Sequence, residues 1–198
     1  MAFIRASQAS VETMRIMGTL TLDDLHYTYE DYAQWQGDWE LIEGVPVAMT
    51  PAPGIEHQLL ASELIRLLGN QVAECPECHV LGETDYKISE ETVVRPDVVV
   101  VCEPVGGAYL DQVPALIVEV VSPSTARRDE RVKLQLYAQQ KVPYYLLAYP
   151  LARRVTAYRL QKESYEKIGD YTKETLTFEE LPCPLSLDCA QLFRVLDR

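Results

Sequence analysis

Two carboxylates stand in segments that otherwise hold only apolar residues. Asp97 directly follows Pro96 and opens a run of four valines, and Glu119 interrupts the apolar run Leu116–Val121. An ionised carboxylate buried without a partner is energetically very costly, so something must compensate these two. Carboxylate oxygens are ligands that Mg²⁺ prefers in proteins. If the two segments are neighbouring strands, the carboxylates lie at one end of a sheet and predict a Mg²⁺ site there.

Each carboxylate also has an interpretation without function. Asp97, at the start of a strand, could simply cap a turn. Glu119 could belong to the exposed face of a strand, although its face-sharing neighbours Ile117 and Val121 are both apolar. Taken together, the two acids indicate a cation site more strongly than either does alone.

Lys133 lies on the helix predicted to follow Glu119, and it has two interpretations. Asp129 precedes it by four residues, so the two could form an ordinary ion pair on the helix surface, worth roughly a few tenths of a kcal/mol. Alternatively, Lys133 lies over the metal site, where an ammonium orients a water molecule or stabilises charge that develops on a phosphate.

Three further residues are candidates on weaker grounds. Glu40 and Glu43 lie on an early predicted hairpin, and strand alternation sends their side chains to opposite faces, so only one can point inward. His57 lies at the start of a long predicted helix. It could be a catalytic base, or a packed or capping histidine.

Hydrophobic periodicity predicts the elements that position these residues. Thr28 and Asp31 form a capping-box pattern before a short helix that ends near Trp35. Strands are expected at 39–43, 45–49, 80–83, 86–88, 97–102, 115–121, 144–149, 155–160 and 165–168, with helices at 56–72 and 126–140 and last helical turns at 190–196. This order predicts a mixed α/β (α+β) fold, with a mixed central β-sheet flanked by helices and an N-terminal hairpin. We expect one domain over residues 21–198 and a flexible tail over 1–20.

Composition and charge exclude several classes of protein. Of 198 residues, 47% are apolar and 24% charged, which is typical of a globular domain and excludes disordered and fibrous chains. Since no apolar run reaches the length of a membrane helix and no secretory signal is visible, we expect a cytoplasmic protein without a membrane partner. The net charge of −12 disfavours strong, indiscriminate binding to nucleic acid. Five arginines have two interpretations: they form a local basic patch, or they belong to a solvated helix end and turn. These are Arg127, Arg128, Arg131, Arg153 and Arg154.

The five cysteines are predicted to be free thiols, as is usual in a cytosolic chain. Cys75-Pro-Glu-Cys78-His79 formally fits a covalent haem attachment pattern, but that requires an exported protein. A redox pair normally opens a helix, whereas this one follows a helix. A zinc site would want a second pair at zinc spacing, and Cys183 and Cys189 are too far apart in sequence to supply it. The pattern therefore favours no metal or haem role.

These residues, in this order and spacing, resemble the Uma2 family within the PD-(D/E)XK nuclease superfamily. The resemblance runs from about residue 28 to 160. The matching pieces are Trp39–Gly44, Thr50–Pro53, His57, Arg95–Val99, Ile117–Thr125, Lys133–Tyr137 and Val142–Leu147. It implies a restriction-endonuclease-like core in which Asp97 matches the first acid of the superfamily motif and Glu119 the second. The motif lysine would fall at Val121, and Lys133 on the following helix stands in for it. Glu40 matches an additional early acid.

The implied activity is that of an endonuclease that hydrolyses phosphodiester bonds of DNA with Mg²⁺ or Mn²⁺. Asp97, Glu119 and Glu40 would bind the metal ion, and Lys133 would position the attacking water or stabilise developing charge. Nucleases of this superfamily commonly act as dimers, which implies a homodimer. Tyr144-Tyr145 and Tyr149-Pro150 depart from the family pattern, in which an acid is expected after Pro143 and an Asp-Pro at the later strand end. Two other hypotheses therefore remain, a nuclease-fold interaction protein with weak or no catalysis, and a phosphodiesterase that acts on RNA or nucleotides.

Overall fold

The largest element of the fold is a six-stranded mixed sheet. The computed structural model describes residues 25–49 and 52–197. The strand order is β10-β9-β8-β7-β6-β3, and within it β7 and β8 run parallel while the other neighbouring pairs are antiparallel. This confirms the mixed central sheet. The strands are β3 (His79–Gly82), β6 (Val98–Val101), β7 (Leu116–Val120), β8 (Tyr144–Tyr149), β9 (Arg154–Gln161) and β10 (Ser164–Tyr171).

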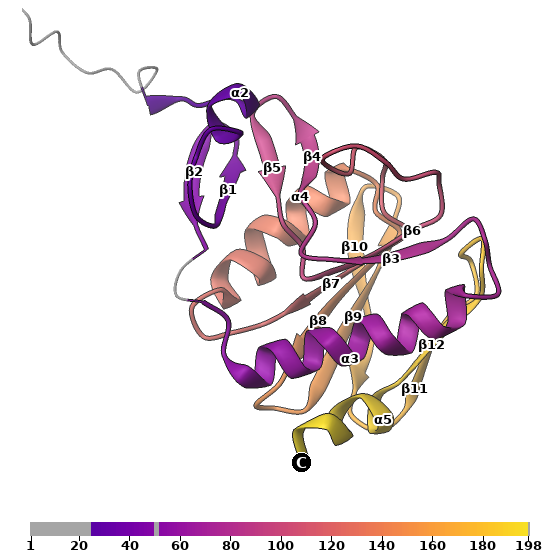
Figure 1. Ribbon diagram of the computed structural model, residues 1–198. Helices are drawn as coiled ribbons and strands as arrows, with labels where there is room; N and C mark the ends of the chain where they lie inside the picture. Colours follow the sequence, from indigo (N-terminus) through magenta and orange to yellow (C-terminus); the bar gives the residue numbers. More distant parts are fainter. Residues whose placement is uncertain (1–24, 50–51, 198) are drawn as a thin grey trace, which may run out of the picture.

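Helices cover both faces of this sheet (Figure 1). On one face α3 (Ile55–Val72) packs with α5 (Cys189–Phe193), a 3₁₀ turn (Arg194–Asp197) and the hairpin of β11 (Thr175–Phe178) and β12 (Leu185–Asp188). On the other face lies a six-residue π-helix, η3 (Arg128–Lys133), which continues into α4 (Leu134–Gln139). Alternate residues of β6 and β7 enter the two cores, which explains why both strands are apolar almost throughout.

A second, four-stranded sheet carries the N-terminal hairpin. Its order is β2-β1-β5-β4, with β1 (Trp39–Ile42), β2 (Val45–Ala48), β4 (Tyr86–Ser89) and β5 (Thr92–Val94), and the short helix α2 (Tyr29–Tyr32) lies beside it. Gly44 turns the hairpin with a φ of +75°, a conformation that favours glycine. The capping box at Thr28 and Asp31 is confirmed, since Asp31 Oδ2 accepts hydrogen bonds from both the backbone N–H and the hydroxyl of Thr28.

Most predicted elements occur within one or two residues of their expected bounds, and the differences are local. β5, β11 and β12 were not predicted. The helix expected over 126–140 begins with the π-helix η3 instead of a regular α-helix. The tail predicted for residues 1–20 lies outside the described residues. Within residues 25–49 and 52–197, no helix is long and apolar enough to cross a membrane.

The prediction of five free thiols is wrong. Disulfides join Cys75 to Cys183 and Cys78 to Cys102, and Cys189 alone is free and buried. The bonded residues are 108 and 24 positions apart in the chain, so local spacing carries no sign of their pairing. They meet because the end of α3, the edge pair β3–β6 and the loop between β11 and β12 converge.

Candidate active site

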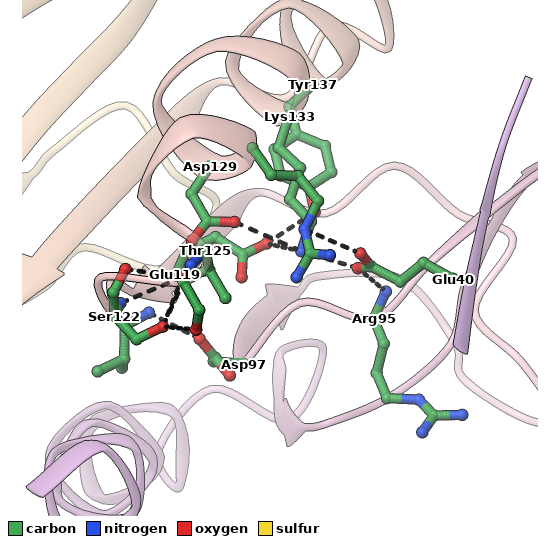
Figure 2. Close-up of polar contacts among 12 residues, drawn as sticks. Glu40, Arg95, Asp97, Glu119, Ser122, Thr125, Asp129, Lys133 and Tyr137 are labelled. Atoms are coloured by element: carbon green, nitrogen blue, oxygen red, sulfur yellow. Dashed lines mark hydrogen bonds and ion pairs between the residues drawn. The ribbon is translucent and has the colours of Figure 1, made fainter. Parts of the chain in front are cut away.

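Asp97 and Glu119 occupy opposed positions on neighbouring strands. The register of β6 against β7 pairs Val98 with Val118, and one step further along the ladder places Asp97 opposite Glu119. Asp97 Oδ2 accepts a hydrogen bond of 2.7 Å from the backbone N–H of Val120. Its carboxylate therefore bonds across to the adjacent strand, as the sequence predicted for a pair of acids at one end of the sheet (Figure 2).

Glu119 is buried, with 3% of its surface exposed, so the interpretation that it lies on a solvent-facing strand is wrong. Its Oε1 atom accepts hydrogen bonds from Lys133 Nζ at 2.9 Å and from the hydroxyl of Tyr137, also at 2.9 Å. Burial raises the pKa of Glu119 well above its usual range, and the ammonium of Lys133 opposes that rise. The ammonium of Lys133 thus favours the charged form of this carboxylate against the cost of its burial.

Lys133 reaches this site from η3 and is likewise buried, with 1% of its surface exposed. Its Nζ atom lies 2.8 Å from Glu40 Oε1 and 2.9 Å from Glu119 Oε1, but 3.9 Å from Asp129. Burial alone would lower the pKa of Lys133, but the carboxylates of Glu119, Glu40 and Asp129 outweigh it and raise that pKa. Lys133 therefore does not form an ordinary surface ion pair with Asp129, because this face of the helix packs against the sheet and both side chains are buried.

Glu40, and not Glu43, faces the site. The side chain of Glu40 is completely buried, and its Oε1 atom accepts a hydrogen bond of 2.9 Å from the backbone N–H of Arg95. Arg128 Nε lies 3.4 Å from Glu40 Oε2. Glu43 is exposed, next to the hairpin turn. Strand alternation predicted that only one of the two acids points inward, and β1 gives that place to Glu40.

His57 joins the site through Asp97. Its Nε2 atom lies 3.3 Å from Asp97 Oδ2, and its Nδ1 atom is buried without a hydrogen-bond partner among the described residues. Burial by itself would lower the pKa of His57, but the hydrogen bond and charge of Asp97 prevail and raise it. The histidine at the start of α3 therefore contacts the acid at the start of β6.

A cavity of about 220 Å³ adjoins these side chains. Its wall includes His57, Asp97, Glu119, Asp129 and Lys133, together with Arg95, Arg128, and Ser122, Ser124 and Thr125 from the loop after β7. The hydroxyls of Ser122 and Thr125 bond to each other at 3.1 Å, and the backbone N–H of Ser122 donates to Thr125 Oγ1, also at 3.1 Å. Hydroxyls and guanidinium groups beside paired carboxylates can bind a phosphate and a cation together.

Sequence reasoning missed several residues that contact the acids of this site. Tyr137 lies four residues after Lys133, which itself lies four after Asp129, so helical spacing could have placed all three on one face. Arg95 contributes its backbone N–H, which residue type cannot reveal. Of the five arginines considered for a basic patch, Arg128 lines the cavity. Arg153 instead pairs with Asp197 at 2.6 Å, and Arg154 lies over the ring of Tyr149.

The donor set fits a hard divalent cation. Most of its ionisable ligand candidates are carboxylates, which suit Mg²⁺ or Mn²⁺, and the wall also holds one imidazole, that of His57. Among the described residues, Glu40 Oε2 and Asp129 Oδ1 are buried carboxylate oxygens without a hydrogen-bond partner. Buried acceptors in this state are rare in proteins and call for a ligand, a water molecule or an ion.

Three comparisons with known proteins bear on this site. A family model described as "Uma2: Putative restriction endonuclease" matches residues 29–190. A crystal structure of a putative nuclease belonging to DUF820 from Anabaena variabilis superposes with a TM-score of 0.70 at 17% sequence identity, covering 85% of this chain and 98% of the other. The search of curated proteins found no match. At that level of identity the superposition establishes the shared fold.

Proposed function

This chain belongs to the Uma2 family of putative restriction endonucleases, and we propose that it is an endonuclease that hydrolyses phosphodiester bonds of DNA with Mg²⁺ or Mn²⁺. The observation that carries the proposal is the opposition of Asp97 and Glu119 at the ends of β6 and β7, with the ammonium of Lys133 2.9 Å from Glu119. Two acids and a lysine in one cavity are the groups that metal-assisted hydrolysis of a phosphodiester requires.

Asp97 and Glu119 would bind the metal ion, with Glu40 as a further ligand. Its Oε2 atom has no hydrogen-bond partner among the described residues and lies 3.4 Å from Arg128 Nε. A bound divalent ion supplies a water of lowered pKa and neutralises charge on the scissile phosphate. Lys133 is positively charged and fixed between Glu40 and Glu119, so it can orient the attacking water or stabilise the charge that develops on the phosphate.

His57 has a supporting role in this proposal. Its contact with Asp97 Oδ2 orients that carboxylate, and its protonation state adjusts the negative charge available to a cation. Arg128 and the hydroxyls after β7, which line the same cavity, would contact substrate phosphate. An endonuclease that cuts both strands of a duplex is expected to act as a homodimer.

The direct test is cleavage of supercoiled plasmid in Mg²⁺ or Mn²⁺, with single-stranded DNA and RNA as parallel substrates. Asp97→Asn and Glu119→Gln should abolish cleavage while thermal unfolding remains cooperative. Lys141→Gln removes an exposed lysine outside the cavity and should cleave like the wild type. Cleavage by Asp97→Asn at the rate of the wild type would refute the proposed metal site.

Two observations favour an alternative, a nuclease-fold protein with weak or no catalysis that serves as an interaction protein. Glu119 Oε1 is already occupied by Lys133 and Tyr137, and the chain carries a net charge of −12. If calorimetry detects no Mn²⁺ binding and none of the three nucleic acids is cut, this alternative replaces the nuclease. Cleavage of RNA alone would support the phosphodiesterase hypothesis.

A further inference from the structure

Four cysteines from distant parts of the chain meet at the end of β6 opposite the candidate active site. Asp97 precedes β6, whereas Cys102 directly follows it. Cys75 and Cys78 lie in the connection between α3 and β3, and Cys183 lies between β11 and β12. Neither the family membership nor the proposed nuclease chemistry gives these cysteines a role.

The sulfur atoms of three of the four cysteines are close enough for one ion to contact them. The Sγ atoms of Cys75, Cys78 and Cys183 lie within 4.8 Å of one another, and those of Cys75 and Cys78 are 3.9 Å apart. Cys102 joins the group through its bond to Cys78. In a tetrahedral zinc site, Zn–S bonds of about 2.3 Å place the sulfur atoms about 3.8 Å apart.

The local backbone also suits metal binding. The N–H of Cys75 donates to the carbonyl of Val72 at 2.8 Å, and the N–H of Cys78 donates to the carbonyl of Cys75 at 3.0 Å. This tight turn presents the two sulfurs of a C-x₂-C pair on one side, which is the usual spacing of half a zinc site. The second half does not come from Cys183 and Cys189, the pair considered in the sequence, but from Cys102 and Cys183.

We propose that the chain, with these thiols reduced, binds one structural Zn²⁺ through Cys75, Cys78, Cys102 and Cys183. The two disulfides are the oxidised, metal-free state of the same four sulfurs. Each disulfide takes up two electrons and two protons from a dithiol reductant, which itself becomes a disulfide. The four thiols then lose protons as they bind the ion as thiolates.

Such an ion would fasten the C-terminal hairpin to the rest of the domain. β11 and β12 form a two-stranded sheet separate from the six-stranded sheet. Their side chains Leu176, Phe178, Leu185 and Leu187 pack into the core that α3 covers. Cys183, between the two strands, would tie the hairpin to the end of α3 and, through Cys102, to β6.

The test is the metal content and thiol state of the full chain, purified with a thiol reductant from cells grown with zinc. We expect one zinc per chain and, by alkylation and mass spectrometry of the denatured protein, no disulfides. Replacement of zinc by Co²⁺ should give the thiolate-to-cobalt charge-transfer absorption and the visible bands of a tetrahedral site. A reduced protein without zinc, or disulfides that persist under the reductant, would overturn the proposal.

Variants locate the ligands. Cys102→Ser and Cys183→Ser should each weaken zinc retention against a chelator at least tenfold, and Cys189→Ser, which changes a buried cysteine outside the cluster, should not. If a ligand variant fails to fold, Co²⁺ titration of the reduced wild type still decides, because absence of the thiolate bands refutes the site. Asp97→Asn should keep its zinc, which separates this inference from the proposed nuclease activity.

Discussion

Lys133 Nζ lies 2.9 Å from Glu119 Oε1, although the lysine comes from a helix and the acid from the centre of a sheet. By the resemblance to the nuclease superfamily, the motif lysine would fall at Val121, which is buried in the core with Leu136 and Tyr137 of α4. The π-helix η3 brings a lysine back to the same carboxylate from above. A lysine therefore lies beside Glu119 although the strand itself carries none.

Removal of this ammonium should destabilise the fold strongly. Lys133→Met leaves Glu40 and Glu119 buried without their cation, and breaking a buried ion pair from one side costs about 3–5 kcal/mol. Chemical denaturation should show that loss. The double variant Lys133→Met with Glu119→Gln should lose less than the sum of the single losses, whereas strict additivity would mean that the two groups do not interact.

The two acids of the N-terminal hairpin should behave differently. Glu40→Gln removes a buried charge that contacts Lys133, so we expect plasmid cleavage to fall by at least tenfold. Glu43→Gln changes an exposed acid three residues away and should leave cleavage within about twofold of the wild type. Equal effects of the two substitutions would contradict the assignment of Glu40 to the site.

The hydroxyl of Tyr137 should matter for cleavage as well as for stability. Tyr137→Phe removes a donor from the buried carboxylate of Glu119, and the loss of such a bond costs about 1–3 kcal/mol. Tyr145→Phe removes a comparable buried bond, to the carbonyl of Asp129. Both variants should unfold at lower denaturant concentration, but only Tyr137→Phe should also slow cleavage, because its partner is a metal-ligand candidate.

The pH dependence of His57 follows from its partner. Since the pKa of His57 is raised in the folded protein, its pairing with Asp97 stabilises the fold fully below the unfolded pKa of about 6.5. That stability is lost as pH rises through the higher folded pKa. NMR titration should find this raised pKa in the wild type. In Asp97→Asn the pKa should fall, because burial remains and only the weaker influence of Glu83 and Asp129 still opposes it. An unchanged pKa would exclude Asp97 as the cause of the rise.

The sequence predicted those features that depend on local hydrophobic periodicity and on the free-energy cost of burying a charge. The near-continuous apolar runs around Asp97 and Glu119 predicted two buried neighbouring strands, with the two acids together at one end of the sheet. The spacing of Asp129 and Lys133 was compatible both with an ion pair on the helix surface and with a lysine in the site. Helical spacing alone does not show which face of a helix packs against a sheet. Only tertiary packing sends Lys133 to Glu40 and Glu119.

Other parts of the site depend on long-range contacts that residue types do not encode. The backbone N–H of Arg95 reaches Glu40 across 55 residues of sequence, and Cys75 meets Cys183 across 108. The strand β5 has three residues, all buried, so no alternation shows in it. β11 and β12 do alternate between buried and more exposed residues, and sequence reasoning missed that pattern.

The apolar sequence of β6 leaves its register against β7 ambiguous during folding. Val98 to Val101 are identical residues buried on both faces, so sliding β6 by one position would bury the same valines equally well. Asp97 breaks this degeneracy, because a slipped strand would turn its carboxylate toward the apolar core under α3 and away from the N–H of Val120. The acid proposed to bind the cation thus also helps to fix the register of β6 against β7 during folding.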